Sequence, residues 1–247
     1  MKIITSKITI PPETPRVSRS GLLDALGENL NFCNATVING RAGTGKTMLA
    51  ADFARRYGQC YGPTSRSAAW YKVDAPDVSL SVFLEYLVAS VARERPGFGR
   101  ETLARYTRTA GAFNISTLVE AYVYDLERQS EPLLLALDDL HLIYDADWVV
   151  PFFHRLLPLL PAEIHLLILG RGLPPAPLWR LRSKQRLFVI NEQMLAFTQP
   201  EAEELFSSYG LGAQEASLAL KQTGGRAADL HAAAIRASAI CLDEVAS

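Results

Sequence analysis

The amino-acid sequence predicts an α/β fold, in which a parallel β-sheet carries helices on both faces. Short apolar runs typical of buried strands alternate along the chain with segments whose apolar residues recur at helical spacing. A glycine-rich turn joins the first apolar run to the first long helical segment. The 247 residues are enough for one large domain, or for one domain with a small companion.

Five apolar runs are expected to form the strands, because strands buried in a parallel sheet are short and almost entirely apolar. These runs lie at 35–39, 68–73, 133–137, 164–169 and 187–190, the last adding one more strand to the four before it. Apolar residues at i, i+3, i+4 and i+7 predict helices at 49–57, 80–91, 115–126 and 148–157. An extended, proline-rich arm is expected before a short helix at 21–30, because proline cannot donate a ladder hydrogen bond.

The last part of the chain is predicted to be helical. Thr198 and Glu201 have the spacing of a capping box, with Pro200 in the first turn. A second helix is expected to end near Gly224 and Gly225, and a third to occupy 227–239. The sequence therefore predicts an α/β domain at 1–190 and a small helical subdomain at 191–247.

Composition excludes several classes of protein. The 25 basic and 26 acidic residues give a net charge of −1, which disfavours the interpretation of the whole chain as a basic DNA-binding domain. Cys33, Cys60 and Cys241 are far apart and form no CxxC pair, so neither a disulfide framework nor a zinc site is supported. The sequence shows neither a signal peptide nor a membrane-spanning run. We therefore expect a cytoplasmic protein without a membrane partner.

The glycine-rich turn fits the phosphate-binding pattern G-x-x-x-x-G-K-[ST] at every fixed position. Its glycines let backbone N–H groups wrap a phosphate, Lys46 reaches the β and γ phosphates, and the Thr47 hydroxyl binds Mg²⁺. The turn also follows a predicted strand and opens a predicted helix, as the motif requires. The expected nucleotide-binding residues here are Gly40, Ala42, Gly43, Thr44, Gly45, Lys46, Thr47 and Met48.

Two acidic residues end the third strand, as in a Walker B segment. We expect Asp138 to hold Mg²⁺ together with Thr47. Asp139 is a candidate for orienting or deprotonating the attacking water, although a carboxylate there could equally be an N-terminal helix cap. Arg171 follows the fourth strand and could sense the γ-phosphate, the alternative being an arginine in a solvated loop. Lys46, Asp138, Asp139 and Arg171 are thus the candidate catalytic residues.

Weaker signals favour ordinary structural roles. His141 forms a DDxH string similar to a helicase motif, but 247 residues cannot supply a second motor domain, so a structural histidine is expected. The basic segment at 179–186 is expected to be solvated, because the net charge is near zero. The string from Tyr71 to Asp74 lacks the Asn of a guanine-reading motif, so adenine is favoured over guanine.

In this order the motifs resemble those of the STAND-type ATPases, and among them the ATPase module of MalT-like (LuxR-type) bacterial transcription activators. Val17 to Leu23 is similar to the V-x-R-x-x-L-L segment of that family, so the resemblance implies that Val17 and Arg19 lie against the adenine. Further matching strings are Trp70-Tyr71, Asp138 to Ile143 (DDxHLI), Leu169-Gly170-Arg171, Arg180-Leu181-Arg182 and Leu195 to Thr198 (LAFT). The resemblance extends over nearly the whole chain.

The resemblance implies a five-stranded P-loop sheet of the additional-strand type, with the small helical subdomain closing over ATP or ADP and Mg²⁺. It implies a switch in which ADP favours a closed resting state and ATP an open state that self-associates. The chain departs from the family at Gly225-Arg226-Ala227, where the usual lid turn has Pro, so contact of the lid with the base is in doubt. Family members bind DNA through domains absent from this sequence, which indicates an ATPase portion of a longer regulator, or alternatively a complete short protein.

The leading functional hypothesis is therefore an ATP/ADP-binding regulatory switch with slow Mg²⁺-dependent hydrolysis. A stand-alone P-loop phosphotransferase is one alternative, although the C-terminal segment offers only Arg226 and Arg236 for a phosphate-covering lid. An interaction module stabilised by nucleotide is the other. The presence of Lys46, Thr47 and Asp138 argues against a module that binds nucleotide only for stability and no longer hydrolyses it.

Overall fold

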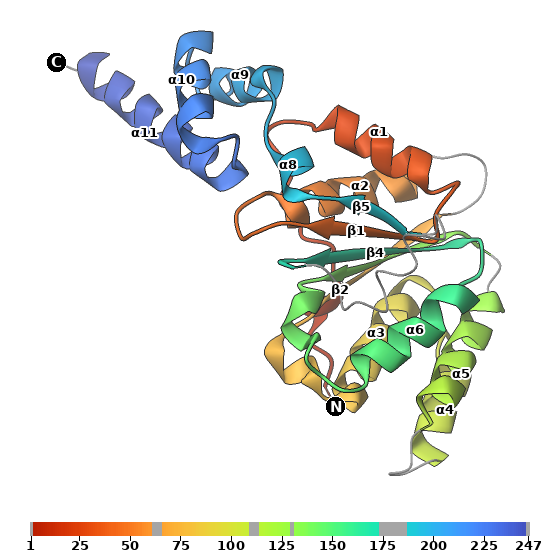
Figure 1. The fold of residues 1–247 in the computed structure, drawn as a ribbon. Helices are drawn as coiled ribbons and strands as arrows, with labels where there is room; N and C mark the ends of the chain where they lie inside the picture. The colour runs from red at the N-terminus through yellow and green to blue at the C-terminus, as the bar shows by residue number, and fades with distance from the viewer. Residues whose placement is uncertain (1, 61–65, 109–113, 129–130, 173–186, 246–247) are drawn as a thin grey trace.

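The computed structural model describes residues 2–60, 66–108, 114–128, 131–172 and 187–245. They form a parallel sheet with helices on both faces and a further group of helices at one end of the sheet (Figure 1). The predicted α/β fold is confirmed. The basic segment at 179–186, which contains the Arg180-Leu181-Arg182 string, lies outside the described residues.

The sheet has five strands in the order β2-β3-β4-β1-β5, and each neighbouring pair is parallel. The strands are β1 (Ala35–Asn39), β2 (Ser67–Lys72), β3 (Leu133–Asp138), β4 (Ile164–Gly170) and β5 (Leu187–Ile190). β4 lies between β1 and β3, which confirms the additional-strand arrangement that the resemblance implies. Because all the strands are parallel, their carboxyl ends meet at one edge, where ligands bind in open α/β sheets.

Helices cover both faces of the sheet (Figure 1). α1 (Ser20–Asn29) and α2 (Lys46–Cys60) pack on one face, and α3 (Leu80–Glu94), α5 (Ile115–Glu127) and α6 (Val149–Leu159) on the other. α4 (Arg100–Arg108) packs against α5. Side chains alternate between the faces along each strand, so Val37 joins the larger core cluster and Ile38 the smaller one. Among the described helices, none combines the length and apolarity that crossing a membrane requires.

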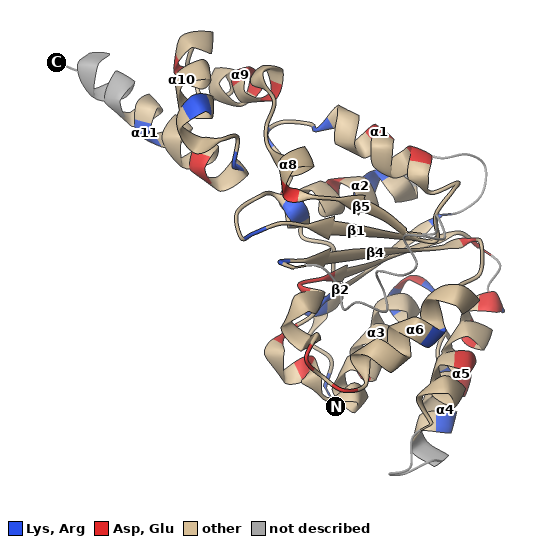
Figure 2. Cartoon of the chain, viewed as in Figure 1, with Lys and Arg blue, Asp and Glu red and all other residues tan. Residues whose placement is uncertain are grey.

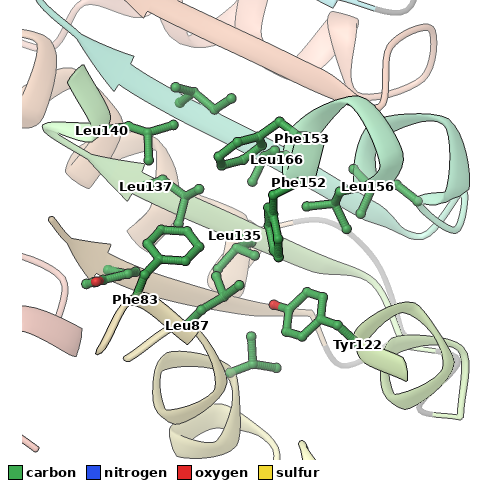
Figure 3. Packing of buried hydrophobic residues seen from close by; sticks show 14 of the residues in the cluster. Phe83, Leu87, Tyr122, Leu135, Leu137, Leu140, Phe152, Phe153, Leu156 and Leu166 are labelled. Atoms are coloured by element: carbon green, nitrogen blue, oxygen red, sulfur yellow. The ribbon is translucent and has the colours of Figure 1, made fainter. Parts of the chain in front are cut away.

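The larger core cluster lies between the sheet and α3, α5 and α6 (Figure 3). Phe83 from α3 meets Phe152 from α6 edge to face, with 5.7 Å between ring centroids. Leu135 and Leu137 of β3 complete this packing and have at most 1% of their surface exposed. The strand that ends in Asp138 is therefore held rigidly. Beyond the strand ends lie the 3₁₀ helices η2 (Ala75–Val78) and η3 (Leu140–Ile143).

The N-terminal arm contains one turn where an extended chain was expected, the 3₁₀ helix η1 (Thr5–Ile8). The turn is anchored by Lys7, whose Nζ donates to both carboxylate oxygens of the fully buried Asp77, at 2.7 and 2.6 Å. Farther along, Arg55 of α2 donates to the carbonyls of Pro11 and Glu13, at 2.6 and 2.9 Å. These bonds hold the arm across the carboxyl edge of the sheet.

The C-terminal part is helical, as predicted. It comprises α8 (Glu192–Leu195), α9 (Gln199–Ser207), α10 (Ala213–Thr223) and α11 (Ala227–Val245). Thr198 and Glu201 form the predicted capping box, and Gly224 ends α10 in the left-handed conformation, with φ 61°. α9, α10 and α11 share a third core cluster that also contains Val17 from the arm, whereas Leu195 of α8 belongs to the smaller cluster of the sheet. The domain boundary at residue 190 stays a prediction.

Candidate nucleotide-binding site

The phosphate-binding pattern forms a tight loop between β1 and α2. Gly43 and Gly45 adopt φ 78° and 88°, in the left-handed region that favours glycine. A Cβ at Gly43 would lie 2.9 Å from both the Ala228 Cβ and an Arg226 nitrogen. The loop thus has the backbone geometry of a phosphate cradle, and α11 approaches it closely.

Lys46 is the first residue of α2 and is buried, with 6% of its surface exposed. Its Nζ donates to the carbonyls of Gly40 and Arg41 at 2.7 and 2.8 Å. Burial lowers the pKa of Lys46, while the neighbouring carboxylate of Asp139 opposes this shift. The lysine is held inside the loop that it was predicted to serve.

Thr47 and Asp138 meet at the base of the loop. The Thr47 hydroxyl donates to Asp138 Oδ1 and Oδ2 at 3.1 and 3.2 Å. Burial and, next, the charge of Asp139 raise the pKa of Asp138 to about 6. Hydroxyl and carboxylate oxygens are ligands that Mg²⁺ prefers, and a bound cation would favour the ionised carboxylate. The two residues predicted to hold Mg²⁺ are therefore adjacent and chemically suited to it.

Asp139 has an unusual backbone conformation for its residue type. Its φ of 56° lies in the left-handed region, and no other non-glycine residue of the described ranges has a positive φ. It occupies the N-cap position of η3, but its side chain makes no capping hydrogen bond. The structure thus places the residue where a cap would lie, without the contact that a cap makes. Its role in catalysis stays a prediction.

A cavity of about 350 Å³ lies beside the phosphate loop and is lined by Lys46, Thr47, Asp139 and Arg171. Arg171 is exposed in this position, so it is both solvated and beside the loop. Both basic and acidic segments lie along this edge of the sheet (Figure 2). The cavity also includes Glu13 of the arm, which sequence reasoning missed because no local pattern relates the arm to the strand ends.

An apolar cleft of about 670 Å³ adjoins this cavity, because both include Gly43, Gly45 and Met48 in their walls. Its other walls come from the arm and from the C-terminal helices. They include Val17, Phe197, Leu205, Ala228, His231 and Ile235. The cleft has the size and apolar lining typical of a small-molecule site. Its walls include Val17 and Arg19, which the resemblance places against the adenine, and that contact stays a prediction.

Arg19 connects the arm to the C-terminal helices. It donates to the carbonyls of Leu195 and Ala196 at 2.7 and 3.0 Å, and its Nε pairs with Glu201 at 3.1 Å. Its guanidinium also lies 4.5 Å from the centre of the Phe197 ring. The structure therefore places Arg19 in the cleft wall, where it fixes the wall itself. Contact between Arg19 and a base stays a prediction.

The start of α11 contacts the phosphate loop directly. Arg226 donates to the Ala42 carbonyl through Nη2 and Nε, at 2.7 and 3.1 Å, and the Ala228 N–H donates to the Gly43 carbonyl at 2.9 Å. Asp229 pairs with the same guanidinium at 2.8 Å. The sequence indicated Arg226 as a departure from the family and as one of two arginines available to a phosphate-covering lid. Its link to the loop had no sequence signal, because 184 residues separate Arg226 from Ala42.

Comparisons with known proteins extend this description. No protein-family model matches the chain. It is 30% identical over 205 residues to the HTH-type transcriptional regulator MalT of Serratia proteamaculans, and 31% identical over 205 residues to that of Yersinia pestis. Each alignment covers 83% of this chain, which spans only 22% of either relative.

Solved structures with a similar fold include the Walker-type ATPase PABY2304 of Pyrococcus abyssi. Its TM-score is 0.58 at 11% identity, over 96% of this chain and 77% of that one. The Aeropyrum pernix ORC1 protein, solved in complex with DNA, has a TM-score of 0.54 at 16% identity, over 95% of this chain and 62% of that one. At these identities the likeness concerns the fold alone, and that fold is the one of P-loop ATPases.

Proposed function

Because the chain is a MalT-like module with the P-loop ATPase fold, we propose that it is a regulatory switch that binds ATP and ADP and slowly hydrolyses ATP with Mg²⁺. The curated relatives are transcriptional regulators, which supports a regulatory role here. We propose further that the module belongs to the STAND and LuxR-type regulators, acts in the cytoplasm, and self-associates in its ATP state. DNA contact would then be made by other domains of such a regulator.

The observation that carries the proposal is the hydrogen bond between Thr47 and Asp138. It joins the start of α2 to the end of β3, beside a loop with left-handed glycines and a buried lysine. A glycine-rich surface turn would need none of these partners. Together they support the proposal of a binding site for a phosphate chain and a divalent cation.

Each residue of this site has a defined task under the proposal. Backbone N–H groups of the loop and Lys46 bind the phosphates, and Thr47 and Asp138 hold Mg²⁺, which when bound neutralises phosphate charge. Asp139 accepts a proton from the attacking water as its oxygen bonds to the γ-phosphorus. The bond from that phosphorus to the bridging oxygen breaks, and ADP leaves. Arg171 contacts the terminal phosphate and distinguishes ATP from ADP.

The contacts between α11 and the loop would couple nucleotide binding to the lid. Phosphate binding draws the Lys46 ammonium from the Gly40 and Arg41 carbonyls, and a loop that rearranges also moves the carbonyls that Arg226 and Ala228 bind. The lid then responds to the nucleotide through differential contacts, which any ligand-driven shift requires.

Thermal unfolding tests the proposal. ATP or ADP at 100 times its Kd should stabilise the chain by about 2.7 kcal/mol, or roughly 5 to 10 °C, with GTP less effective. Lys46→Ala should abolish the shift, whereas Lys221→Ala, on the exposed side of α10, should retain it. A turnover assay with and without candidate acceptors distinguishes a switch from a phosphotransferase. If no nucleotide shifts the transition, and denaturation releases no bound nucleotide, the proposal is wrong.

A further inference from the structure

Three buried polar atoms lie near Gly170, at the carboxyl ends of β1 and β4. They are Asn39 Oδ1, His141 Nδ1 and the Tyr144 hydroxyl oxygen, and none has a hydrogen-bond partner within the described residues. Buried polar atoms are nearly always paired, because leaving one unpaired costs free energy. Three unpaired atoms in one region indicate a common partner outside the polypeptide.

Strand geometry brings Asn39 to this region. Val37 and Ile168 face the larger core cluster, and side chains two residues apart on a strand face the same way. Asn39 and Gly170 therefore point to that same face. They are also direct neighbours in the parallel register of β1 and β4.

Gly170 makes room for the other two groups. A Cβ at this position would lie 3.1 Å from the Tyr144 hydroxyl oxygen and 3.7 Å from the His141 Cβ. The absence of a side chain thus lets Tyr144 and His141 reach over the end of β4. We call the space bordered by Asn39, His141, Tyr144 and Gly170 the Gly170 nook.

The nook adjoins the phosphate-side cavity. His141 Nδ1 lies 3.8 Å from Asp139 Oδ1, and Asp139 lines that cavity together with Lys46 and Arg171. Asn39 immediately precedes Gly40, the first residue of the phosphate loop. One side of the nook therefore faces the carboxylate expected to act on the attacking water.

We propose that the Gly170 nook holds one ordered water molecule, and that this water and His141 position the Asp139 carboxylate for ATP hydrolysis. This inference rests on the proposed function, since Asp139 needs orienting only if ATP is hydrolysed. Three polar atoms match the number of hydrogen bonds that a buried water makes. The nook walls contain no Lys or Arg, so they suit a neutral molecule better than a phosphate. His141 and Tyr144 are positioning residues, which act through Asp139.

Variants that remove one hydrogen-bonding atom test the positioning role. Tyr144→Phe and His141→Phe should each lower kcat about tenfold, the effect of losing one hydrogen bond in the transition state. The Kd for ADP should stay within about twofold, because an interaction made only in the transition state leaves ground-state binding unchanged. His141→Asn, whose amide can replace Nδ1, should recover most of the rate. Tyr124→Phe and His154→Asn change exposed residues of the same types and serve as controls.

A second measurement avoids turnover. Aluminium fluoride with ADP and Mg²⁺ mimics the transferring phosphoryl group, so it should raise the melting temperature above that with ADP alone. Tyr144→Phe and His141→Phe should lose most of this increment. The inference is overturned if both variants keep the wild-type melting-temperature increment and the wild-type rate. It is also overturned if ADP affinity and rate fall by the same factor, because equal losses indicate a purely structural role.

The occupant itself is tested without nucleotide. A high-resolution crystal structure of the wild-type chain should show a water within hydrogen-bonding distance of Asn39, His141 and Tyr144. A nook without that water overturns the inference even if ATP is hydrolysed. Failure of the wild type to bind or hydrolyse ATP, with the water present, would instead contradict the proposed function and the link to Asp139.

Discussion

The Thr47 hydroxyl donates a hydrogen bond to each carboxylate oxygen of Asp138, across 91 positions of sequence. Although β4 lies between β1 and β3, the helix that follows β1 packs against β3 as well, and its first turn brings Thr47 to the end of that strand. Donors from the Thr47 hydroxyl and the Asp139 backbone favour the charged form of this acid, but burial and the charge of Asp139 outweigh them and raise its pKa to about 6. A divalent cation would complete the charge balance, and the first prediction follows from this.

Asp138→Asn should remove the Mg²⁺ dependence of nucleotide binding. The amide keeps the size of the side chain and its contact with Thr47 but lacks the charge that binds the cation. We expect the Mg²⁺-dependent part of the thermal shift with ATP to disappear, and the apparent Mg²⁺ affinity to fall by about tenfold or more. Asp145→Asn, at an exposed position beyond η3, is the control and should behave as wild type. An unchanged response to Mg²⁺ would remove Asp138 from the metal site.

Gly43→Ala should disrupt both the phosphate loop and the start of α11. The φ of 78° costs an alanine about 1 kcal/mol, and its Cβ would collide with Ala228 and Arg226. We expect loss of nucleotide binding and a melting temperature lower by about 2 to 4 °C per kcal/mol. Gly172→Ala, where a Cβ meets nothing within 4 Å, is the matched control. Normal binding by Gly43→Ala would mean that the loop is less constrained than its geometry indicates.

Arg226→Ala should loosen the start of α11 from the phosphate loop. The substitution removes both guanidinium bonds to the Ala42 carbonyl and frees Asp229. Hydrogen exchange at the Ala228 amide should accelerate by about tenfold, as expected for the loss of roughly 1.4 kcal/mol of local stability. Arg226→Lys should give an exchange rate between those of the wild type and Arg226→Ala, since lysine is charged but lacks the forked donor geometry of arginine. Arg236→Ala, exposed on the same helix, should leave the exchange rate at Ala228 unaltered.

His165 makes the stability of the fold depend on pH. Its Nε2 lies 2.9 Å from the Thr36 hydroxyl, and burial lowers its pKa from 6.5 to about 4. The folded chain keeps this imidazole neutral, while the unfolded chain takes up a proton as the pH falls below 6.5. The free energy of unfolding therefore has its full value above pH 6.5 as far as His165 is concerned. It falls as the pH decreases from 6.5 to 4, by about 3 kcal/mol in total.

Urea unfolding at several pH values measures this effect. His165→Gln can keep the bond to Thr36 without titrating, so its free energy of unfolding should vary less between pH 6.5 and 4 than that of the wild type. His154→Gln changes an exposed histidine and should retain the wild-type dependence. If the free energy of unfolding falls with pH equally in the wild type and in His165→Gln, groups other than His165 cause the loss of stability in acid.

The parts of the fold that depend on local pattern were predictable from the sequence. Strand β3 is apolar because it is buried on both sides, and helix α3 has one apolar face because it covers a sheet. The phosphate loop was predictable for a related reason, since its glycine and lysine spacing is fixed by the shape of a phosphate chain. The capping box at Thr198 is likewise a local interaction between near neighbours.

Contacts between distant segments could not be predicted in this way. Arg226 binds a backbone carbonyl. Because every residue has a backbone carbonyl, the sequence does not indicate which one Arg226 binds. The grouping of Asn39, His141 and Tyr144 depends on strand register and on the missing side chain of Gly170. A structural role was expected for His141 because the chain is too short for the second motor domain of a helicase, and the sequence does not reveal which side chains surround His141.

The position of Val17 has a practical consequence for protein engineering. This residue belongs to the arm, yet it is buried, with 3% exposure, in the core of the C-terminal helices. Arg19 ties the same stretch to Leu195, Ala196 and Glu201. Part of the core of the C-terminal helices is therefore supplied by the opposite end of the chain. A shortened protein that begins after residue 19 would leave apolar surface of the C-terminal helices exposed, and would be expected to aggregate rather than fold as a smaller stable protein.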